Sequence, residues 1–185
     1  MDNNAPLFIK INELIKTNKR ITVALDGNCA AGKTTIAAKL KSMYNCNVFA
    51  MDDFFLRSSQ RSPKRLCEIG GNIDYERFAK EVLFPIQTGA PFAYKPYNCQ
   101  TQAFDKPVNV VPTLLNIIEG TYSLHPYFGK YYDLAIFLSV DANEQRRRLL
   151  ARNEKLYDRF INDWIPKENN YFETFNITEK CDLIF

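Results

Sequence analysis

Residues 21–40, ITVALDGNCAAGKTTIAAKL, place a lysine and two threonines directly behind a loop bounded by glycines. Residues 27–34, GNCAAGKT, match the phosphate-loop pattern G-x-x-x-x-G-K-[ST] without a mismatch. Glycines at both ends let the backbone wrap an anion closely and direct successive N–H groups toward it. A helix beginning near Lys33 adds the positive end of its dipole. This segment therefore predicts a nucleoside triphosphate site.

Each position of this loop is expected to contribute to nucleotide binding. Lys33 should reach the β- and γ-phosphates, and the Thr34 hydroxyl should complete the coordination shell of Mg²⁺. The predicted ligands are ATP and Mg²⁺, with GTP left open as an alternative donor. The predicted nucleotide-binding residues are Gly27, Asn28, Cys29, Ala30, Ala31, Gly32, Lys33, Thr34 and Thr35.

Acidic residues follow two further apolar runs. Asp52 and Asp53 come after NVFAM (47–51), and Glu119 lies near the end of TLLNIIEG (113–120). A carboxylate in such a place can accept the proton of an attacking hydroxyl or help to hold Mg²⁺, although a lone aspartate is often a cap or turn residue. Two adjacent acids beside a phosphate loop favour catalysis by at least one of them, and the spacing does not say which. For Glu119, the spacing fits a magnesium or substrate contact and a capping role equally well.

Four arginines gather in the predicted helix at 142–175, which is expected to break near Asn153. They are Arg146, Arg147, Arg148 and Arg152. Such runs usually form solvated faces, but Arg148 and Arg152 are four residues apart and share one face of the helix. A lid that supplies guanidinium groups to a transferring phosphate is a recurrent arrangement. We therefore predict a lid at about 148–160 with Arg148 and Arg152 as catalytic residues.

These residues need a scaffold that brings them to one place. Short apolar runs predict five strands, at 21–25, 47–51, 113–120, 133–140 and 181–185. Helical patterns between and around them lie at 6–18, 33–43, 75–87 and 142–175. This alternation predicts a three-layer α/β P-loop fold with a five-stranded parallel sheet, in a single domain of residues 1–185. Active sites of such sheets lie at the carboxyl ends of the strands, where the loop and the acids should meet.

The connections between these elements give further expectations. Asp74 should cap the helix at 75–87, with Phe78, Val82 and Phe84 as its apolar anchors. Residues 56–72 are polar and rich in turn formers, which predicts a mobile loop, and residues 91–111 predict a small irregular hairpin. The basic residues of the loop favour an anionic ligand if they face the site, and otherwise form a solvated surface; they are Arg57, Arg61, Lys64 and Arg65. His125 is expected to have a structural role near a turn.

The composition is that of an ordinary globular protein, with 185 residues, 46% hydrophobic and 24% charged. A net charge of +3 does not favour nucleic acid or an acidic membrane as a partner. The five cysteines contain no CxxC pair, which argues against a zinc site or a disulfide framework and fits a reducing cytoplasm. The first 20 residues lack the pattern of a signal peptide. We expect a cytoplasmic protein with a small-molecule partner, and homo-oligomerisation is left open.

Six segments, taken in order, resemble bacterial uridine kinase-like proteins of the phosphoribulokinase/uridine kinase group of P-loop kinases. They are GNCAAGKTT, MDDFF, GGNIDYERF, IIEGTYSLHP, DLAIFLSVDANEQRRRLLARN and FINDWIPKENNYF. The resemblance covers about residues 20–185. It implies an ATP-dependent transfer of a phosphoryl group to a small alcohol, such as the 5′-OH of uridine or cytidine.

The resemblance also implies roles for individual residues. Asp52 matches the general base of the family's D-S-F-Y motif, which lies near Mg²⁺, and Asp53 stands where the family has a serine. Glu119 matches the family's Glu-Gly, so the implied metal residues are Thr34, Asp52 and Glu119. The implied substrate residues are Asp53, Asp74, Tyr97 and Glu119, with Asp74 and Tyr97 resembling the nucleoside site.

The hairpin departs from the uridine kinases, because its sequence YNCQTQAF keeps few of their nucleoside-binding residues. Gln102 follows Tyr97 by five residues, where these enzymes place a histidine. The acceptor therefore stays open between a nucleoside and another alcohol, such as a sugar phosphate or a vitamin precursor. A nucleotide-binding switch with slow hydrolysis is a further alternative, although the hairpin and the arginine lid resemble parts of an acceptor pocket.

Overall fold

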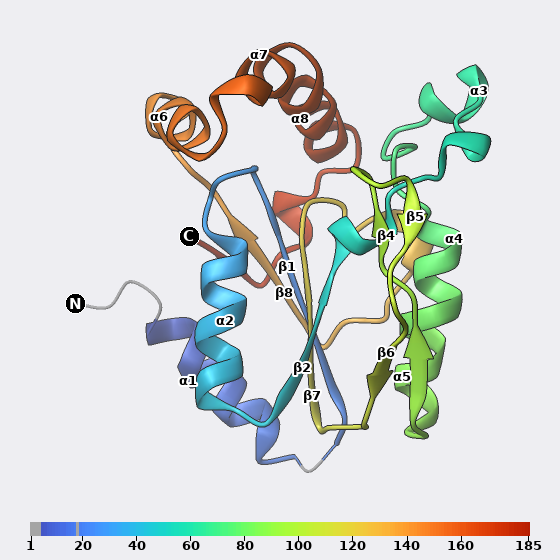
Figure 1. Cartoon of the computed structure of the whole chain (residues 1–185). Helices are drawn as coiled ribbons and strands as arrows, with labels where there is room; N and C mark the ends of the chain where they lie inside the picture. Colours follow the sequence, from blue (N-terminus) through green and yellow to red (C-terminus); the bar gives the residue numbers. More distant parts are fainter. Residues whose placement is uncertain (1–4, 18) are drawn as a thin grey trace.

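The central sheet has five parallel strands in the order β2-β7-β1-β8-β9, with helices on both faces (Figure 1). The computed structural model describes residues 5–17 and 19–185. The strands are β1 (Ile21–Gly27), β2 (Cys46–Ala50), β7 (Leu115–Glu119), β8 (Leu134–Leu138) and β9 (Leu183–Ile184). The predicted five-stranded parallel sheet is confirmed, and the phosphate-loop strand β1 lies at its centre.

Two hydrophobic cores lie on opposite faces of this sheet. Adjacent residues on a strand point to opposite faces, and Ile117 and Ile118 of β7 accordingly belong to different cores. Every residue of β1 and β7 is buried, which explains why apolar residues occur at both odd and even positions of these strands. The sheet therefore has a fixed register, in which Leu25 pairs with Glu119.

The first core is covered by α1 (Ala5–Ile15) and α2 (Lys33–Met43). Leu7 and Ile11 are fully buried and lie four residues apart, as an amphipathic helix requires. The helix predicted at 6–18 thus exists, although it ends at Ile15, and residue 18 lies outside the described residues. The helix predicted at 33–43 is confirmed.

The second core is covered partly by one continuous helix. It consists of α4 (Tyr75–Phe78), a π-helical turn (Ala79–Leu83) and α5 (Phe84–Thr88). Phe78 and Val82 are fully buried, as predicted, but the prediction for Phe84 is wrong because its side chain is 50% exposed. Phe84 follows Val82 by two residues, or about half a helical turn, so it points away from the core.

Two short antiparallel pairs form the predicted hairpin region. The strands β3 (Phe92–Tyr94) and β6 (Val108–Val110) pair with each other, as do β4 (Tyr97–Asn98) and β5 (Ala103–Phe104). The predicted loop at 56–72 contains two short helices, a 3₁₀ helix (Ser58–Gln60) and α3 (Pro63–Leu66). This part of the chain therefore has more regular structure than the sequence predicts.

The C-terminal helices lie over the carboxyl ends of the strands, at the top of Figure 1. They are α6 (Ala142–Arg152), α7 (Tyr157–Arg159), a π-helical turn (Phe160–Trp164) and α8 (Ile165–Thr174). Asn153 ends α6 in an extended conformation, which confirms the predicted break. Over residues 5–17 and 19–185, none of the helices has the length and apolar character needed to cross a bilayer.

The contrast between Phe78 and Phe84 gives a test of the second core. Phe78→Ala should lower the free energy of unfolding by about 3–5 kcal/mol, because it leaves a cavity in a fully buried cluster. Phe84→Ala, on the same continuous helix, should cost less than about 1 kcal/mol because this ring is half exposed. Urea unfolding measures both, and equal losses would contradict the helix orientation.

Candidate active site

The loop after β1 has a backbone shape that glycine makes possible. Gly27 has a φ of 132°, and a Cβ atom at this position would overlap the Leu138 carbonyl oxygen of β8. Asn28 N donates a hydrogen bond to the same carbonyl oxygen at 3.1 Å. Gly32 has a φ of 101° and directly precedes the first turn of α2. The loop therefore leaves the sheet closely packed on β8 and ends at a helix N-terminus, which is the geometry of an anion site.

The Lys33 side chain is held against the start of this loop. This side chain is buried, and Nζ donates to Gly27 O at 2.6 Å and to Asn28 O at 2.8 Å. A third hydrogen bond runs to Thr121 Oγ1 at 3.2 Å, a partner that the sequence analysis does not predict. Three oxygen atoms thus hold the ammonium group, and phosphate oxygens are acceptors of the same kind.

Thr34 and Glu119 lie side by side, as the sequence predicts for two magnesium residues. Thr34 Oγ1 donates to Glu119 Oε1 at 3.2 Å. Burial and the nearby Asp52 charge raise the pKa of the Glu119 carboxyl, while Lys33 and the Thr34 hydroxyl lower it. A hydroxyl and a carboxylate are the hard oxygen ligands that Mg²⁺ prefers, so these residues fit such an ion.

A dedicated protein cage for a metal is absent from the described part of the chain. No group of three or more His, Cys, Asp or Glu side chains is arranged to hold a metal ion there. Mg²⁺ does not need such a group, because it keeps several waters and usually takes one or two carboxylates together with substrate phosphates. The assignment of Thr34, Asp52 and Glu119 to Mg²⁺ stays a prediction.

Asp52 lies near these groups, in a short 3₁₀ helix (Met51–Phe54) that follows β2. Its side chain keeps contact with solvent, but the surrounding protein displaces enough water to raise the pKa of its carboxyl. The charges of Lys33 and Arg152 act in the opposite direction and lower this pKa. The structure therefore brings Asp52 into electrostatic contact with the phosphate loop, with Glu119 and with the end of α6.

Asp53 has different surroundings from Asp52. The Tyr94 hydroxyl of β3 donates to Asp53 Oδ2 at 3.4 Å, and Arg77 Nη2 donates to the Asp53 carbonyl oxygen at 2.8 Å. Burial raises the pKa of this carboxyl, and the hydrogen bond from Tyr94 lowers it. Asp53 is thus tied to the hairpin, whereas Asp52 lies nearer to Lys33, a difference that the sequence does not reveal.

The two predicted lid arginines also differ. Arg148 donates from Nε to Glu144 Oε1 at 2.7 Å and from Nη1 to the Ala30 carbonyl oxygen of the phosphate loop at 2.9 Å. Arg152 makes no hydrogen bond or ion pair with the described residues, and its charge acts on Asp52. Arg148 is therefore attached to the loop backbone, and Arg152 is the arginine with an uncommitted guanidinium group.

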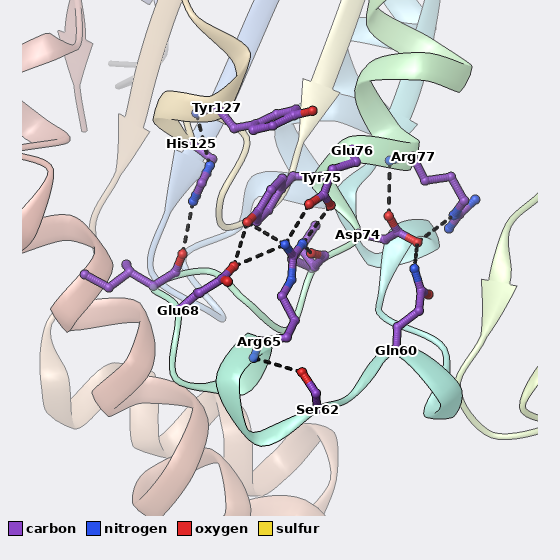
Figure 2. A network of polar contacts seen from close by, with 12 residues as sticks. Gln60, Ser62, Arg65, Glu68, Asp74, Tyr75, Glu76, Arg77, His125 and Tyr127 are labelled. Atoms are coloured by element: carbon purple, nitrogen blue, oxygen red, sulfur yellow. Dashed lines mark hydrogen bonds and ion pairs between the residues drawn. The ribbon is translucent and has the colours of Figure 1, made fainter.

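Asp74 has the capping role that the sequence predicts (Figure 2). Its carboxylate accepts hydrogen bonds from Arg77 N at 3.1 Å and from Gln60 Nε2 at 2.9 Å, and it forms an ion pair with Arg77 Nε at 3.7 Å. Tyr97, the other predicted nucleoside residue, is buried and contacts the Phe104 ring edge-on at 5.6 Å between centroids. A substrate role for either residue stays a prediction.

Arg65 fastens the segment around α3 to α4, at the centre of Figure 2. Its guanidinium group donates to both Glu76 carboxylate oxygens at 2.7 Å and to Ile73 O at 2.9 Å. It also binds the Tyr75 hydroxyl and the Glu68 carboxylate. These partners occupy the guanidinium group, so Arg65 is a structural residue rather than a candidate ligand for an anionic substrate.

His125 has the structural role expected from its place near a turn. Nδ1 accepts a hydrogen bond from Tyr127 N at 3.2 Å, and Nε2 lies 3.0 Å from the Ile69 carbonyl oxygen, which makes Nε2 the protonated nitrogen. The ring stacks on Tyr75 at 4.7 Å between centroids, and burial lowers its pKa. A neutral imidazole thus links the turn at 125–128 to the segment before α4 (Figure 2).

A buried carboxylate directly behind the loop is missed by the sequence analysis. Asp26 is fully buried and accepts hydrogen bonds from Gly27 N at 2.7 Å, Leu124 N at 2.9 Å and Tyr171 Oη at 2.8 Å. Burial raises its pKa, and these hydrogen bonds lower it. An ionisable residue inside the apolar run ITVALDG is the signal that could have identified it, because such a group needs specific partners.

With this geometry established, the structure can be compared with known proteins. No protein-family model and no curated protein matches the sequence. Among solved structures, a possible uridine kinase from Bacillus stearothermophilus has 20% identity and a TM-score of 0.71, over 97% of this chain and 99% of that chain. The chain has the fold of the uridine kinase-like P-loop kinases. This finding confirms the predicted fold over nearly the whole chain.

Further structures share this P-loop kinase fold. A candidate fructose transport system kinase from Silicibacter sp. TM1040 has 21% identity and a TM-score of 0.64, over 90% of each chain. The D-glycerate 3-kinase of Cryptococcus neoformans has 14% identity and a TM-score of 0.57, over 80% of this chain and 78% of that chain. Because these proteins are named for different substrates, the shared fold does not identify an acceptor.

The carboxylates of the site should influence each other in solution. Asp52→Asn should lower the pKa of Glu119, because the negative charge of Asp52 raises it in the wild type. Asp53→Asn should lower the same pKa by less, since the charge of Asp53 is the weakest of the influences on Glu119. Carbon-13 NMR titration of the Glu119 carboxyl measures both. An unchanged Glu119 pKa in Asp52→Asn would contradict the proximity of these two groups.

Proposed function

We propose that this protein is an ATP-dependent kinase that transfers the γ-phosphoryl group to a hydroxyl of a small molecule. The observation that carries the proposal is the position of Asp52, close enough to Lys33 and Arg152 for both charges to lower its pKa. A base, a phosphate-binding lysine and a free arginine at one edge of the sheet are the parts that phosphoryl transfer uses. The kinase fold of the compared structures supports the same reaction.

In the proposed reaction each of these residues has a separate task. Lys33 and the backbone N–H groups at the start of α2 bind the phosphates. Asp52 accepts the proton of the acceptor hydroxyl. As it does so, the hydroxyl oxygen bonds to the γ-phosphorus, and the bond between this phosphorus and the leaving ADP breaks. Arg152 stabilises negative charge on the γ-phosphoryl group during its transfer. The lid at 148–160 excludes water that would otherwise hydrolyse ATP. Mg²⁺, held beside Thr34 and Glu119, would neutralise charge on the phosphates.

For the acceptor, we propose the 5′-OH of a nucleoside such as uridine or cytidine. The support is the resemblance of the segments containing Asp74 and Tyr97 to the nucleoside site of uridine kinases, together with the similarity to a possible uridine kinase. In this proposal Asp53 and Glu119 complete the acceptor side of the site. A cytoplasmic location and the absence of nucleic-acid and membrane partners stay predictions.

A second acceptor class, an anionic alcohol, is favoured by one specific feature. The Cys99 thiol, beside the β4–β5 turn, has a pKa that burial raises and that the nearby guanidinium groups of Arg61 and Arg159 lower. Two guanidinium groups near this thiol would suit a carboxylate or phosphate on an acceptor that reaches the β4–β5 turn. In addition, Gln60 already occupies the Asp74 carboxylate that a ribose would need.

The base assignment can be tested with paired substitutions. Asp52→Asn should reduce kcat by about 10²–10⁴-fold while leaving ATP affinity near that of the wild type. Asp53→Asn should affect mainly the KM of the acceptor. Because the pKa of Asp52 is raised, wild-type activity should fall at low pH through a pKa above 3.8, and this limb should disappear in Asp52→Asn. A larger loss of kcat in Asp53→Asn would reverse the assignment.

The acceptor can be identified by ADP release from Mg·ATP with a panel of nucleosides, sugar phosphates, carboxylated alcohols and vitamin-like alcohols. Uridine or cytidine should stimulate release at least tenfold, and Lys33→Ala should abolish the stimulation because it removes the phosphate-binding ammonium. Stimulation only by phosphorylated or carboxylated alcohols would replace the nucleoside with an anionic acceptor. Tight ATP binding with no stimulation by any compound would favour the nucleotide switch.

A further inference from the structure

Two C-terminal helices, α6 and α8, hold both backbone groups of one phosphate-loop residue. Cys29 N donates to Glu168 Oε2 of α8 at 3.0 Å, and Cys29 O accepts from Gln145 Nε2 of α6 at 2.9 Å. The exposed fractions of Gln145 and Glu168 are only 6% and 8%. Both backbone groups of the partly buried Cys29 are therefore satisfied by side chains from helices distant in the sequence.

A second contact attaches α8 to the strand before the loop. Tyr171 is fully buried, and its hydroxyl donates to Asp26 Oδ2 at 2.8 Å. Asp26 Oδ1 in turn accepts a hydrogen bond from Gly27 N at 2.7 Å. Glu168 and Tyr171 are three residues apart and share one face of α8, so this face contacts the chain on both sides of Gly27.

Glu168 places a carboxyl group in a buried position beside the phosphate loop. Burial raises its pKa, and only the Cys29 hydrogen bonds and the Lys33 charge act against this rise. A carboxylate beside a site for anionic phosphates is unfavourable unless it makes a strong interaction of its own. The hydrogen bond from the Cys29 backbone N–H, at 3.0 Å, is an interaction of this kind.

We propose that Gln145 and Glu168 are positioning residues that fix the phosphate loop in its binding conformation before the nucleotide arrives. We call this pair the Cys29 clamp. By fixing the N–H and the C=O of Cys29, the clamp orients the following N–H groups of the loop toward the phosphates. A loop that is ordered in advance loses less freedom on binding, and the affinity for the nucleotide is higher for that reason. The identity of the ligand as a nucleotide rests on the proposed function, whereas the existence of the Cys29 clamp does not.

Three substitutions and one control test the clamp. Glu168→Met keeps the length of the side chain and removes its oxygens, Glu168→Gln keeps one acceptor, and Gln145→Leu removes the donor to Cys29 O. Glu173→Met is the matched control, because Glu173 lies on the exposed side of α8. Two quantities are measured: hydrogen exchange of the Cys29 amide in nucleotide-free protein by NMR, and the Kd of Mg·ADP by calorimetry.

Glu168→Met should increase exchange of the Cys29 amide and raise the Kd of Mg·ADP by about tenfold, the effect of one lost hydrogen bond to a charged group. Glu168→Gln should stay within about threefold of the wild type, because an amide oxygen still accepts the bond. Gln145→Leu should weaken ADP binding in the same direction, and Glu173→Met should match the wild type. The recovery in Glu168→Gln separates positioning from a general loss of packing.

Wild-type exchange and wild-type ADP affinity in both Glu168→Met and Gln145→Leu would overturn the clamp. If Glu168→Met does not fold, Gln145→Leu and Glu168→Gln carry the test, and an unchanged Kd in Gln145→Leu overturns the proposal. A wild-type protein that does not bind Mg·ADP would instead contradict the proposed kinase. In that case the exchange of the Cys29 amide still decides whether the clamp exists, so the two failures are distinguishable.

Discussion

A phosphate loop can bind an anion only if the N–H groups that face the anion stay available while the other polar groups of the loop find partners within the protein. Here side chains satisfy the carbonyl oxygens of four consecutive loop residues. Lys33 binds those of Gly27 and Asn28, and α6 supplies the donors for the next two. A buried carbonyl without a partner would cost about 1–3 kcal/mol. The packing of α6 against the loop is therefore a condition for the shape of the loop.

The same edge of the sheet collects negative charge. Asp52, Asp53 and Glu119 each have a raised pKa, and the displacement of water by surrounding protein is the largest cause in all three. Their mutual repulsion adds to this effect for Glu119 and Asp53. Three neighbouring acids, two of them near the buried Lys33, form an arrangement that a divalent cation would stabilise, because it supplies positive charge there. The acid cluster is thus physically consistent with the proposed use of Mg²⁺.

The elements and the loop could be predicted from the sequence because both depend on local signals. Apolar runs marked all five strands, and the loop pattern needs only residues 27–34. The prediction that Phe84 is buried was wrong because a residue near the end of an amphipathic helix can lie on its buried or its exposed face. The choice between Asp52 and Asp53 and the partners of Cys29 depend on contacts across the fold, such as the hydroxyl of Tyr94. No periodicity in one sequence encodes such contacts.

The separation of the loop from its supports has a consequence for biosynthesis. Gln145 lies 116 residues after Cys29, and Glu168 lies 139 residues after it. A ribosome therefore completes the phosphate loop long before it adds the side chains that hold the loop in shape. During this interval β1 also lacks its neighbours β7 and β8, because both strands come later in the chain. A nascent chain consequently acquires an ordered nucleotide site only after α8 has been synthesised and packs against the loop.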